Sequence, residues 1–125
     1  ILNYLQWISK EVETVKDIPW LGLPKIKSDH KPDPEHGMKL YKQYCLACHQ
    51  ADGGGGGILT EADGKVIPPI WGPESFNNGA GMSTMKMLAP FILLNMPYEQ
   101  ATLTEEEALD IASYVLQQNR PTFHQ

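Results

Sequence analysis

Two cysteines and a histidine lie within five residues in the stretch CLACH, which runs from Cys45 to His49. This C-x-x-C-H spacing is the pattern for covalent haem attachment. Each thiol can add across one vinyl group of the porphyrin, and one helical turn would carry both sulfurs along the same edge of the ring. The motif therefore predicts one covalent haem c, held by Cys45 and Cys48, with His49 as an iron ligand.

Three other kinds of site use the same residue types. A structural zinc site needs four ligands, and a thioredoxin-like redox pair needs a βαβ setting that this helix- and loop-rich sequence does not show. A simple disulfide would not call for the adjacent histidine. The other histidines, His30, His36 and His124, have no paired ligand spacing and are expected to face solvent. Haem attachment is the favoured interpretation.

The sixth iron ligand is predicted to be a methionine. Met96 is favoured, because it ends an apolar stretch and precedes a proline that would hold the chain extended and present the sulfur. Met38 lies too near the attachment motif. Met82, Met85 and Met87 remain alternatives, although methionines inside a helix usually pack in the core. Histidine with methionine raises the haem potential and leaves no open coordination position, which favours electron transfer.

Several local signals place helices around the motif. Apolar residues spaced three and four apart predict an amphipathic helix over residues 2–16. Asp33 as a cap and Pro34 in the first turn predict the start of a helix that leads into the motif. Thr104 with Glu107 three residues later forms a capping box, which predicts the last helix.

The middle of the chain is predicted to be less regular. Ser83 is expected to cap a helix over residues 84–95, with a kink or restart at Pro90. The Asp-Gly pair at 63–64 predicts a small hairpin. The glycine run at 53–57 lacks the spacing of a phosphate-binding loop and is expected to form a flexible surface loop.

The composition fits one small domain. The chain has 125 residues, 11 of them glycine and 10 proline, which favours long loops. A formal net charge of −5 argues against nucleic acid and favours redox partner proteins that carry a basic docking patch. No stretch approaches the ~18 apolar residues of a membrane span. Any signal peptide is expected to have been removed.

The sequence resembles the class I c-type cytochromes. The matching segments are GMKLY before the motif, CLACH itself, PPIWG after it, NMP at 95–97, and LTEEEALDIASYVLQQNRP at the end. The resemblance implies that the first and last core helices cross closely, with Gly37, Tyr41 and Tyr114 at the crossing.

The same resemblance implies further residues around the haem. Pro68 would accept a hydrogen bond from the second ring nitrogen of His49, which orients the ligand. Ile70 and Trp71 would pack on the porphyrin.

A narrower resemblance links nearly the whole chain to the C-terminal haem domain of two-haem thiosulfate dehydrogenases and to related single-haem proteins. It is carried by YLQWIS, PDPEHGMKLYKQYCLACHQADGGG, WGPESFNNGAGM and FILLNMP. Those enzymes have two C-x-x-C-H motifs and a separate cysteine ligand, whereas this chain has one motif and no third cysteine. The resemblance implies that only the electron-relay half is present.

These observations predict an all-α, class I cytochrome c fold of four or five helices with long loops around one haem. Residues 1–125 are expected to form a single domain, with an N-terminal helix and loop over 1–32 and a haem-binding core over 33–120. The predicted function is periplasmic electron transfer by a carrier that is not itself an enzyme and has no catalytic residues. The alternative is a haem domain or subunit of an enzyme of sulfur metabolism, similar to thiosulfate dehydrogenase or tetrathionate reductase.

Overall fold

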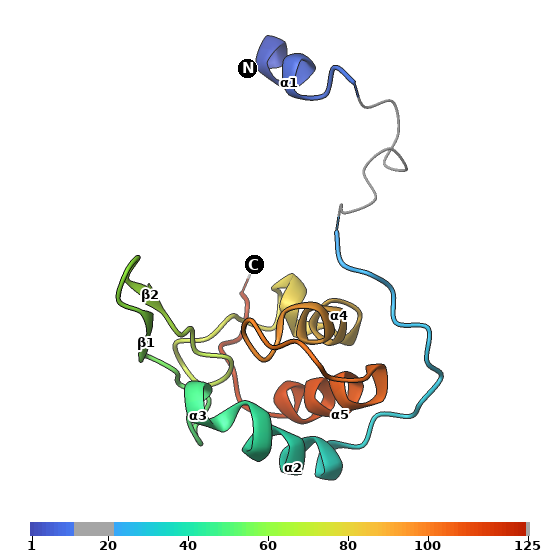
Figure 1. Cartoon of the computed structure of the whole chain (residues 1–125), viewed down its shortest axis with the longest axis vertical. Coiled ribbons are helices and arrows are strands. Elements are labelled where there is room, and N and C mark those ends of the chain that lie inside the picture. Colours follow the sequence, from blue (N-terminus) through green and yellow to red (C-terminus); the bar gives the residue numbers. More distant parts are fainter. Residues whose placement is uncertain (12–21, 125) are drawn as a thin grey trace.

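The computed structural model describes residues 1–11 and 22–124. Within them the chain forms five α-helices, one 3-10 helix and one two-stranded antiparallel hairpin (Figure 1). The prediction of a mostly helical chain with four or five helices and long loops is confirmed. In chain order the elements are α1 Leu2–Ile8, α2 Pro34–Tyr44, α3 Leu46–His49, β1 Ile58–Thr60, β2 Lys65–Val66, the 3-10 helix η2 Gly81–Ser83, α4 Met85–Asn95 and α5 Glu105–Leu116.

The two core helices α2 and α5 begin where their capping residues predict. The carboxylate of Asp33 accepts hydrogen bonds from the backbone N–H groups of Glu35 and His36, at 3.0 and 3.2 Å. At the start of α5, the Thr104 hydroxyl accepts from the Glu107 backbone at 3.2 Å, and the Glu107 carboxylate accepts from the Thr104 backbone at 3.0 Å. Both caps satisfy N–H groups that a helix leaves without partners.

The start of α4 differs from the prediction. Ser83 ends the 3-10 helix instead of capping α4, and its hydroxyl donates to the carbonyl oxygens of Asn78 and Ala80. Thr84 is the N-cap, without a side-chain hydrogen bond. Pro90 is buried inside α4, which continues unbroken from Met85 to Asn95.

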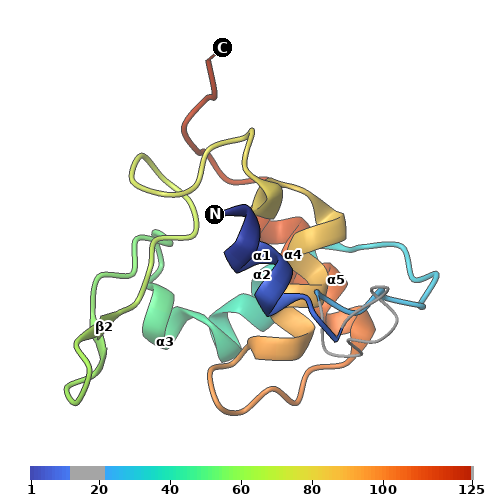
Figure 2. The same ribbon diagram turned by 90° about the horizontal axis from the view of Figure 1, so that it is seen from above.

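Helix α5 lies between α2 and α4 (Figure 1). Gly37 of α2 meets the backbone of α5, where a Cβ atom would overlap the carbonyl oxygen of Asp110. A glycine is therefore required at this crossing, as the family resemblance implies. Both views place α3 and the β1–β2 hairpin on the same side of this helical body (Figure 2).

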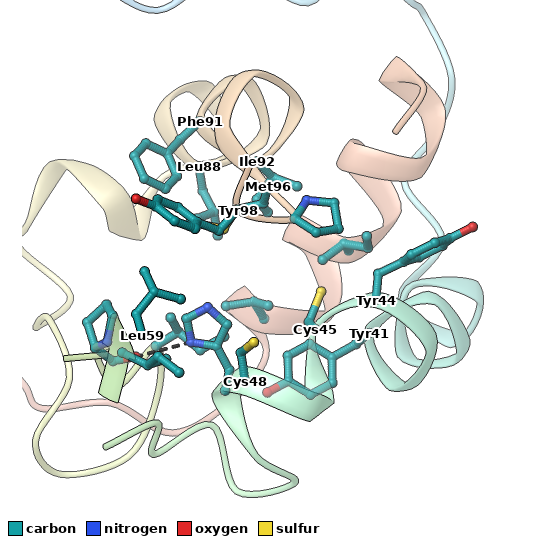
Figure 3. A pocket seen from close by; sticks show the side chains of 17 residues that line it. Tyr41, Tyr44, Cys45, Cys48, Leu59, Leu88, Phe91, Ile92, Met96 and Tyr98 are labelled. Atoms are coloured by element: carbon teal, nitrogen blue, oxygen red, sulfur yellow. Dashed lines mark hydrogen bonds between the residues drawn. The ribbon is translucent and has the colours of Figure 1, made fainter. Parts of the chain in front are cut away.

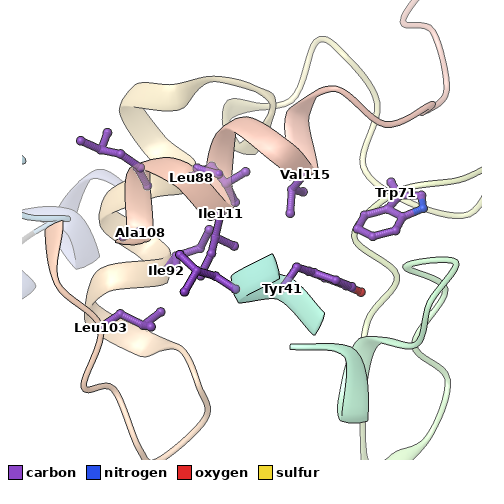
Figure 4. Close-up of a cluster of buried hydrophobic side chains, with 12 residues drawn as sticks. Tyr41, Trp71, Leu88, Ile92, Leu103, Ala108, Ile111 and Val115 are labelled. Atoms are coloured by element: carbon purple, nitrogen blue, oxygen red, sulfur yellow. The ribbon is translucent and has the colours of Figure 1, made fainter. Parts of the chain in front are cut away.

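Apolar side chains from all three core helices form one cluster (Figure 4). Tyr41 is almost completely buried, and its hydroxyl donates to the carbonyl oxygen of Gln50 at 2.6 Å. Its ring lies 5.0 Å from Trp71 and 5.5 Å from Tyr114, measured between centroids. The aromatic group joins α2, α5 and the loop after the hairpin.

Helix α1 is different, because none of its residues is buried. It lies away from the helical body in Figure 1. The predicted helix over 2–16 is present as Leu2–Ile8, and residues 12–16 lie outside the described residues. Among the described residues, no helix has the length and hydropathy to cross a membrane.

Candidate functional site

An apolar cavity opens between the α2–α3 turn, the end of α4 and the hairpin (Figure 3). It contains about 930 Å³ of space free of protein atoms, counting its open mouth. The lining residues are Tyr41, Tyr44, Cys45, Cys48, His49, Leu59, Ile67, Pro68, Ile70, Leu88, Phe91, Ile92, Met96, Pro97, Tyr98, Ile111 and Val115.

The cavity brings together nearly all the site residues that the sequence predicts. They come from three separate parts of the chain, namely the motif, the loop after the hairpin, and the end of α4. The predicted residues that line the cavity are Cys45, Cys48, His49, Pro68, Ile70 and Met96.

The two cysteines sit on one turn of helix. Cys45 ends α2, and its carbonyl oxygen accepts hydrogen bonds from the backbone of Cys48 and His49, at 3.2 and 2.9 Å. Burial, and to a lesser degree the neighbouring Cys48, raises the pKa of the Cys45 thiol to about 11. Neither sulfur is in a disulfide. In the described part of the chain, no group of three or more histidine, cysteine or acidic side chains is arranged to hold a metal ion.

His49 is oriented by the backbone that follows the hairpin. Its Nδ1–H donates to the carbonyl oxygen of Pro68 at 3.1 Å, the bond drawn as a dashed line in Figure 3. Because a carbonyl can only accept, this bond leaves Nε2 as the nitrogen with a free lone pair. Burial lowers the pKa of His49, and the bond to Pro68 offsets only part of that shift. The imidazole is therefore held in the neutral form that binds metals.

Met96 faces this group from the other wall of the cavity. It is the C-cap of α4, and its extended backbone turns the chain out of the helix. In Figure 3 it lies with Leu88 and Ile92 on the α4 side, opposite Cys45 and Cys48. Of the five methionines, Met96 alone lines the cavity.

The other candidate methionines lie elsewhere. Met82 and Met85 pack against the apolar cluster, and Met87 is exposed.

Trp71 lies behind the cavity wall and not on it. The indole packs edge-on against Tyr114, with centroids 5.8 Å apart, and covers Gly53. The arrangement gives Trp71 contact with the aromatic group of the core, whereas Ile70 reaches the cavity.

The glycine segment after the motif is packed against the loop that carries Pro68. Gly53 and Gly55 have positive φ angles, 68° and 57°, and Cβ atoms there would overlap the Trp71 ring and the Ile67 and Pro68 carbonyls. The Gly55 N–H donates to the carbonyl oxygen of His49 at 3.1 Å. Residues predicted to be a flexible surface loop thus bring the Pro68 carbonyl beside His49. The only sequence signal was the position of the glycines directly after the motif.

A polar cluster that the sequence does not predict lies outside the cavity. Asp110 of α5 has a side chain that is 2% exposed. Its carboxylate accepts from His30 Nε2 at 2.8 Å, His36 Nδ1 at 2.7 Å and the backbone of Asp33 at 2.7 Å. We call these four residues the Asp110 cluster. His30 and His36 therefore do not simply face solvent as predicted.

The Asp110 carboxylate is stabilised in its charged form. Burial by itself raises the pKa of the group, but the hydrogen bonds from His36, Asp33 and His30 outweigh it and leave the pKa below its usual value. The signal that could have revealed the cluster is a carboxylate within the mostly apolar second half of α5.

The cavity suits a flat, mostly apolar cofactor with a central metal. Its walls are nearly all apolar, and they include two thiols on one helical turn, a neutral imidazole, and a thioether that lies opposite the thiols (Figure 3). This donor set fits a covalently attached haem with two axial ligands. It offers only two thiols and one imidazole for zinc, short of four such ligands.

Comparison with known proteins gives independent information on whether this cavity holds a haem. Residues 32–115 match the family described as cytochrome c oxidase, cbb3-type, subunit III. The matched region begins before α2 and ends within α5, so it contains the cavity and both core helices.

Curated relatives extend the match over the whole chain. The thiosulfate dehydrogenase of Allochromatium vinosum is 42% identical over 127 residues, covering 100% of this chain and 46% of the relative. The thiosulfate dehydrogenase of Thiomonas intermedia is 39% identical over 121 residues, covering 95% of this chain and 38% of the relative. The chain thus spans less than half the length of these relatives.

A solved structure also matches nearly the whole chain. The as-isolated form of the thiosulfate dehydrogenase TsdBA from Marichromatium purpuratum superposes with a TM-score of 0.76 and 35% sequence identity. The match covers 96% of this chain and 26% of that one.

These relatives correct one prediction. The sequence predicts an electron carrier that is not an enzyme, but the curated relatives carry the name of an enzyme, which suggests an enzymatic role. The presence of a single C-x-x-C-H motif does not argue against an enzyme, because the chain corresponds to less than half of each relative.

Proposed function

Because this chain belongs to the cytochrome c family described as cbb3-type cytochrome c oxidase subunit III, and is a class I c-type cytochrome with a covalent haem c, we propose that it is the electron-transfer haem domain of a thiosulfate-oxidising enzyme. One observation carries the proposal. The two thiols, the imidazole and the thioether lie around one apolar cavity, although they come from distant parts of the chain. When bound, the haem supplies one-electron redox chemistry.

Cys45 and Cys48 attach the cofactor in this proposal. Each thiol would add across one vinyl group of the porphyrin, with its sulfur bonded to one carbon of the former double bond and its hydrogen to the other. The short α3 turn supports this role, because it holds both side chains at the same edge of the cavity (Figure 3). The raised pKa of Cys45 supports a protonated thiol as the starting species.

His49 and Met96 are proposed as the axial ligands. His49 offers Nε2 to the iron while Nδ1 is occupied by Pro68, and that hydrogen bond fixes the ring and strengthens it as a donor. Met96 presents its thioether from the opposite wall. Ile70, Ile92 and the other apolar residues exclude water, which together with a thioether ligand raises the reduction potential.

We also propose a periplasmic location, because covalent haem c is attached outside the cytoplasm. The domain would pass electrons to a redox protein that carries a basic docking patch. The net charge of −5 supports such a partner.

Replacing Met96 by alanine tests the ligand assignment. We expect the weak far-red iron–thioether band of the ferric protein to disappear, and the midpoint potential to fall by on the order of 0.1 V, since axial ligands set the potential. Absorption spectra and a redox titration measure both. The matched control is Met87→Ala, whose side chain is exposed outside the cavity. An unchanged band in Met96→Ala would show that another residue ligates the iron.

Thiosulfate-dependent reduction tests the enzymatic role. A chimaera in which this chain replaces the matching 127-residue stretch of the Allochromatium vinosum enzyme supplies the rest of such an enzyme. We expect thiosulfate to reduce the haem of this chain, followed by its visible absorbance, with ascorbate as a positive control. A haem that ascorbate reduces and thiosulfate leaves oxidised would argue against the proposal.

A further inference from the structure

The walls of the cavity carry no side chain that could balance a negative charge. None of the lining residues is a lysine, an arginine or an acidic residue. A haem carries two propionate side chains, whose carboxylates are ionised at neutral pH. A carboxylate that leaves water without hydrogen bonds or a cation destabilises the complex. Polar groups are therefore needed at the edge of the cavity where the propionates lie.

The proposed attachment through Cys45 and Cys48 indicates which edge that is. The vinyl groups of a haem are on two adjacent pyrrole rings, and the propionates are on the other two. Bonds to both thiols would place the propionates at the edge of the porphyrin away from these cysteines. In Figure 3, Leu59 and Tyr98 lie on the side of the cavity away from Cys45. Leu59 belongs to β1, and Tyr98 to the turn at 97–100 that follows Met96.

Tyr98 supplies a hydroxyl on that side. Three tyrosines line the cavity. The Tyr41 hydroxyl already donates to the carbonyl oxygen of Gln50 at 2.6 Å. Tyr44 directly precedes Cys45 and lies on the side of the thiols (Figure 3). Tyr98 is 39% exposed, and its hydroxyl points away from Cys45 (Figure 3). Its O–H is therefore placed to meet a polar group at the opposite edge.

Lys65 brings a positive charge next to Tyr98. It begins β2, and its Nζ lies 3.2 Å from Oδ2 of Asp63. The hydrogen bond with Asp63 is the main cause that raises the pKa of Lys65, followed by the charge and hydrogen bond of Tyr98 and, more weakly, the charge of Glu99. An ammonium group has three N–H donors. Asp63 and the Tyr98 oxygen occupy two of them, which leaves one donor for a further carboxylate.

We propose that Lys65 and Tyr98 bind one haem propionate, and that the ammonium and the hydroxyl each donate a hydrogen bond to its carboxylate. This assignment rests on the proposed attachment through Cys45 and Cys48. The propionate would then join the hairpin to the turn after Met96, which both border the cavity. The positive charge of Lys65 would also favour the ferrous haem, which carries one positive charge less than the ferric form.

Replacing Lys65 by methionine in the holo-protein tests the contact. We expect the propionate bending mode in the resonance Raman spectrum to shift to lower frequency, because its frequency rises with hydrogen bonding. The equilibrium constant for reduction should fall about twofold to fivefold, the range of an exposed ion pair. Lys65→Arg keeps the charge and should restore both values. The matched control is Lys39→Met, which removes the same charge from an exposed position on α2.

Tyr98→Phe removes only the hydroxyl. We expect a smaller shift of the same Raman mode in the same direction. Because both residues would act on one carboxylate, the effects of Lys65→Met and Tyr98→Phe should not add in the double variant. The far-red band of the ferric protein should persist in every variant, which separates this contact from a change in iron ligation near Met96.

Two results would overturn the assignment while leaving the proposed function intact. The first is a propionate mode that stays unchanged in both Lys65→Met and Tyr98→Phe although the haem remains covalently bound. The second is an equal loss of reduction potential in Lys39→Met, which would indicate a general effect of charge. A native protein whose intact mass shows no haem would instead contradict the attachment through Cys45 and Cys48, and this assignment with it.

Discussion

The two ends of α2 meet very different surroundings. Near its N-terminus, Gly37 lies against the backbone of α5, with no room for a Cβ atom. At its C-terminus, Cys45 borders a cavity of about 930 Å³. The crossing is completed by protein atoms, whereas the cavity is completed by the haem. The fold therefore supplies its own packing at one end of α2 and depends on the cofactor at the other.

The two ends of α2 therefore contribute to the stability of the domain in different ways. Side chains around the cavity lack protein neighbours on one side and forfeit dispersion contacts there unless the porphyrin fills the space. Beside Asp110, which meets Gly37 at the crossing, Ala108 and Ala112 of α5 are fully buried in protein and close-packed. Changes at the cavity should act through loss of the haem, and changes at the crossing should act directly on the helix pair.

Removing both attachment thiols should have the largest effect. In the double variant Cys45→Ser with Cys48→Ser, we expect little stable helix, since a domain with a net stability of about 5–15 kcal/mol would lose the largest apolar body in its core. Circular dichroism and thermal melting measure this, with the wild-type holo-protein as control. If the variant without haem kept its full helicity and melted cooperatively, the residues around the cavity would be stable without the cofactor, which would contradict this comparison.

Gly37→Ala should be next in size. Its Cβ would overlap the Asp110 carbonyl, so the helices must separate, at an expected cost of about 2–4 kcal/mol. Chemical denaturation of the holo-protein measures the loss. Gly81→Ala is the matched control, because a Cβ there meets nothing within 4 Å. If both variants cost the same, the crossing would be less tightly packed than the structure indicates.

Asp110→Asn should have the smallest effect and a distinctive pH dependence. At neutral pH we expect a loss of about 1–3 kcal/mol, because buried hydrogen bonds to a charged group are weakened. The folded state lowers the pKa of Asp110, so its contribution is present above the unfolded pKa of about 3.9 and is lost as the pH falls through the folded value.

The Asn variant should therefore lose less stability than the wild type when the pH falls from 5 to 2. Denaturant midpoints across this range measure the difference. Glu74→Gln changes an exposed carboxylate and is the control. A parallel loss of stability in the wild type and the Asn variant would mean that Asp110 is not held by the cluster.

The features that the sequence predicts correctly depend on interactions between residues that are close together in the chain. The motif Cys45–His49 and the Thr104 capping box are local, and both fold as expected. Met96 could be singled out because a helix end and a proline mark it in the sequence. Its position on the cavity wall that also holds the two cysteines and His49 needed the fold, and its bond to iron remains a proposal.

Contacts between distant residues escaped prediction. The local sequence marks Asp110 only as a charged residue among mostly apolar neighbours, and its partners His30 and His36 are more than seventy positions away. Trp71 follows Ile70 directly, yet only Ile70 reaches the cavity, because the indole has aromatic neighbours on two other elements.

Asp110 makes contacts through both its main chain and its side chain, and this affects how a force on the chain would pass through the domain. Its main chain touches Gly37, and its side chain holds His30 and the start of α2. A force applied to the chain before His30 would therefore reach α5 at the N-terminal end of α2, where Gly37 packs against Asp110. The opposite end, with Cys45 and Cys48, would be shielded from the load.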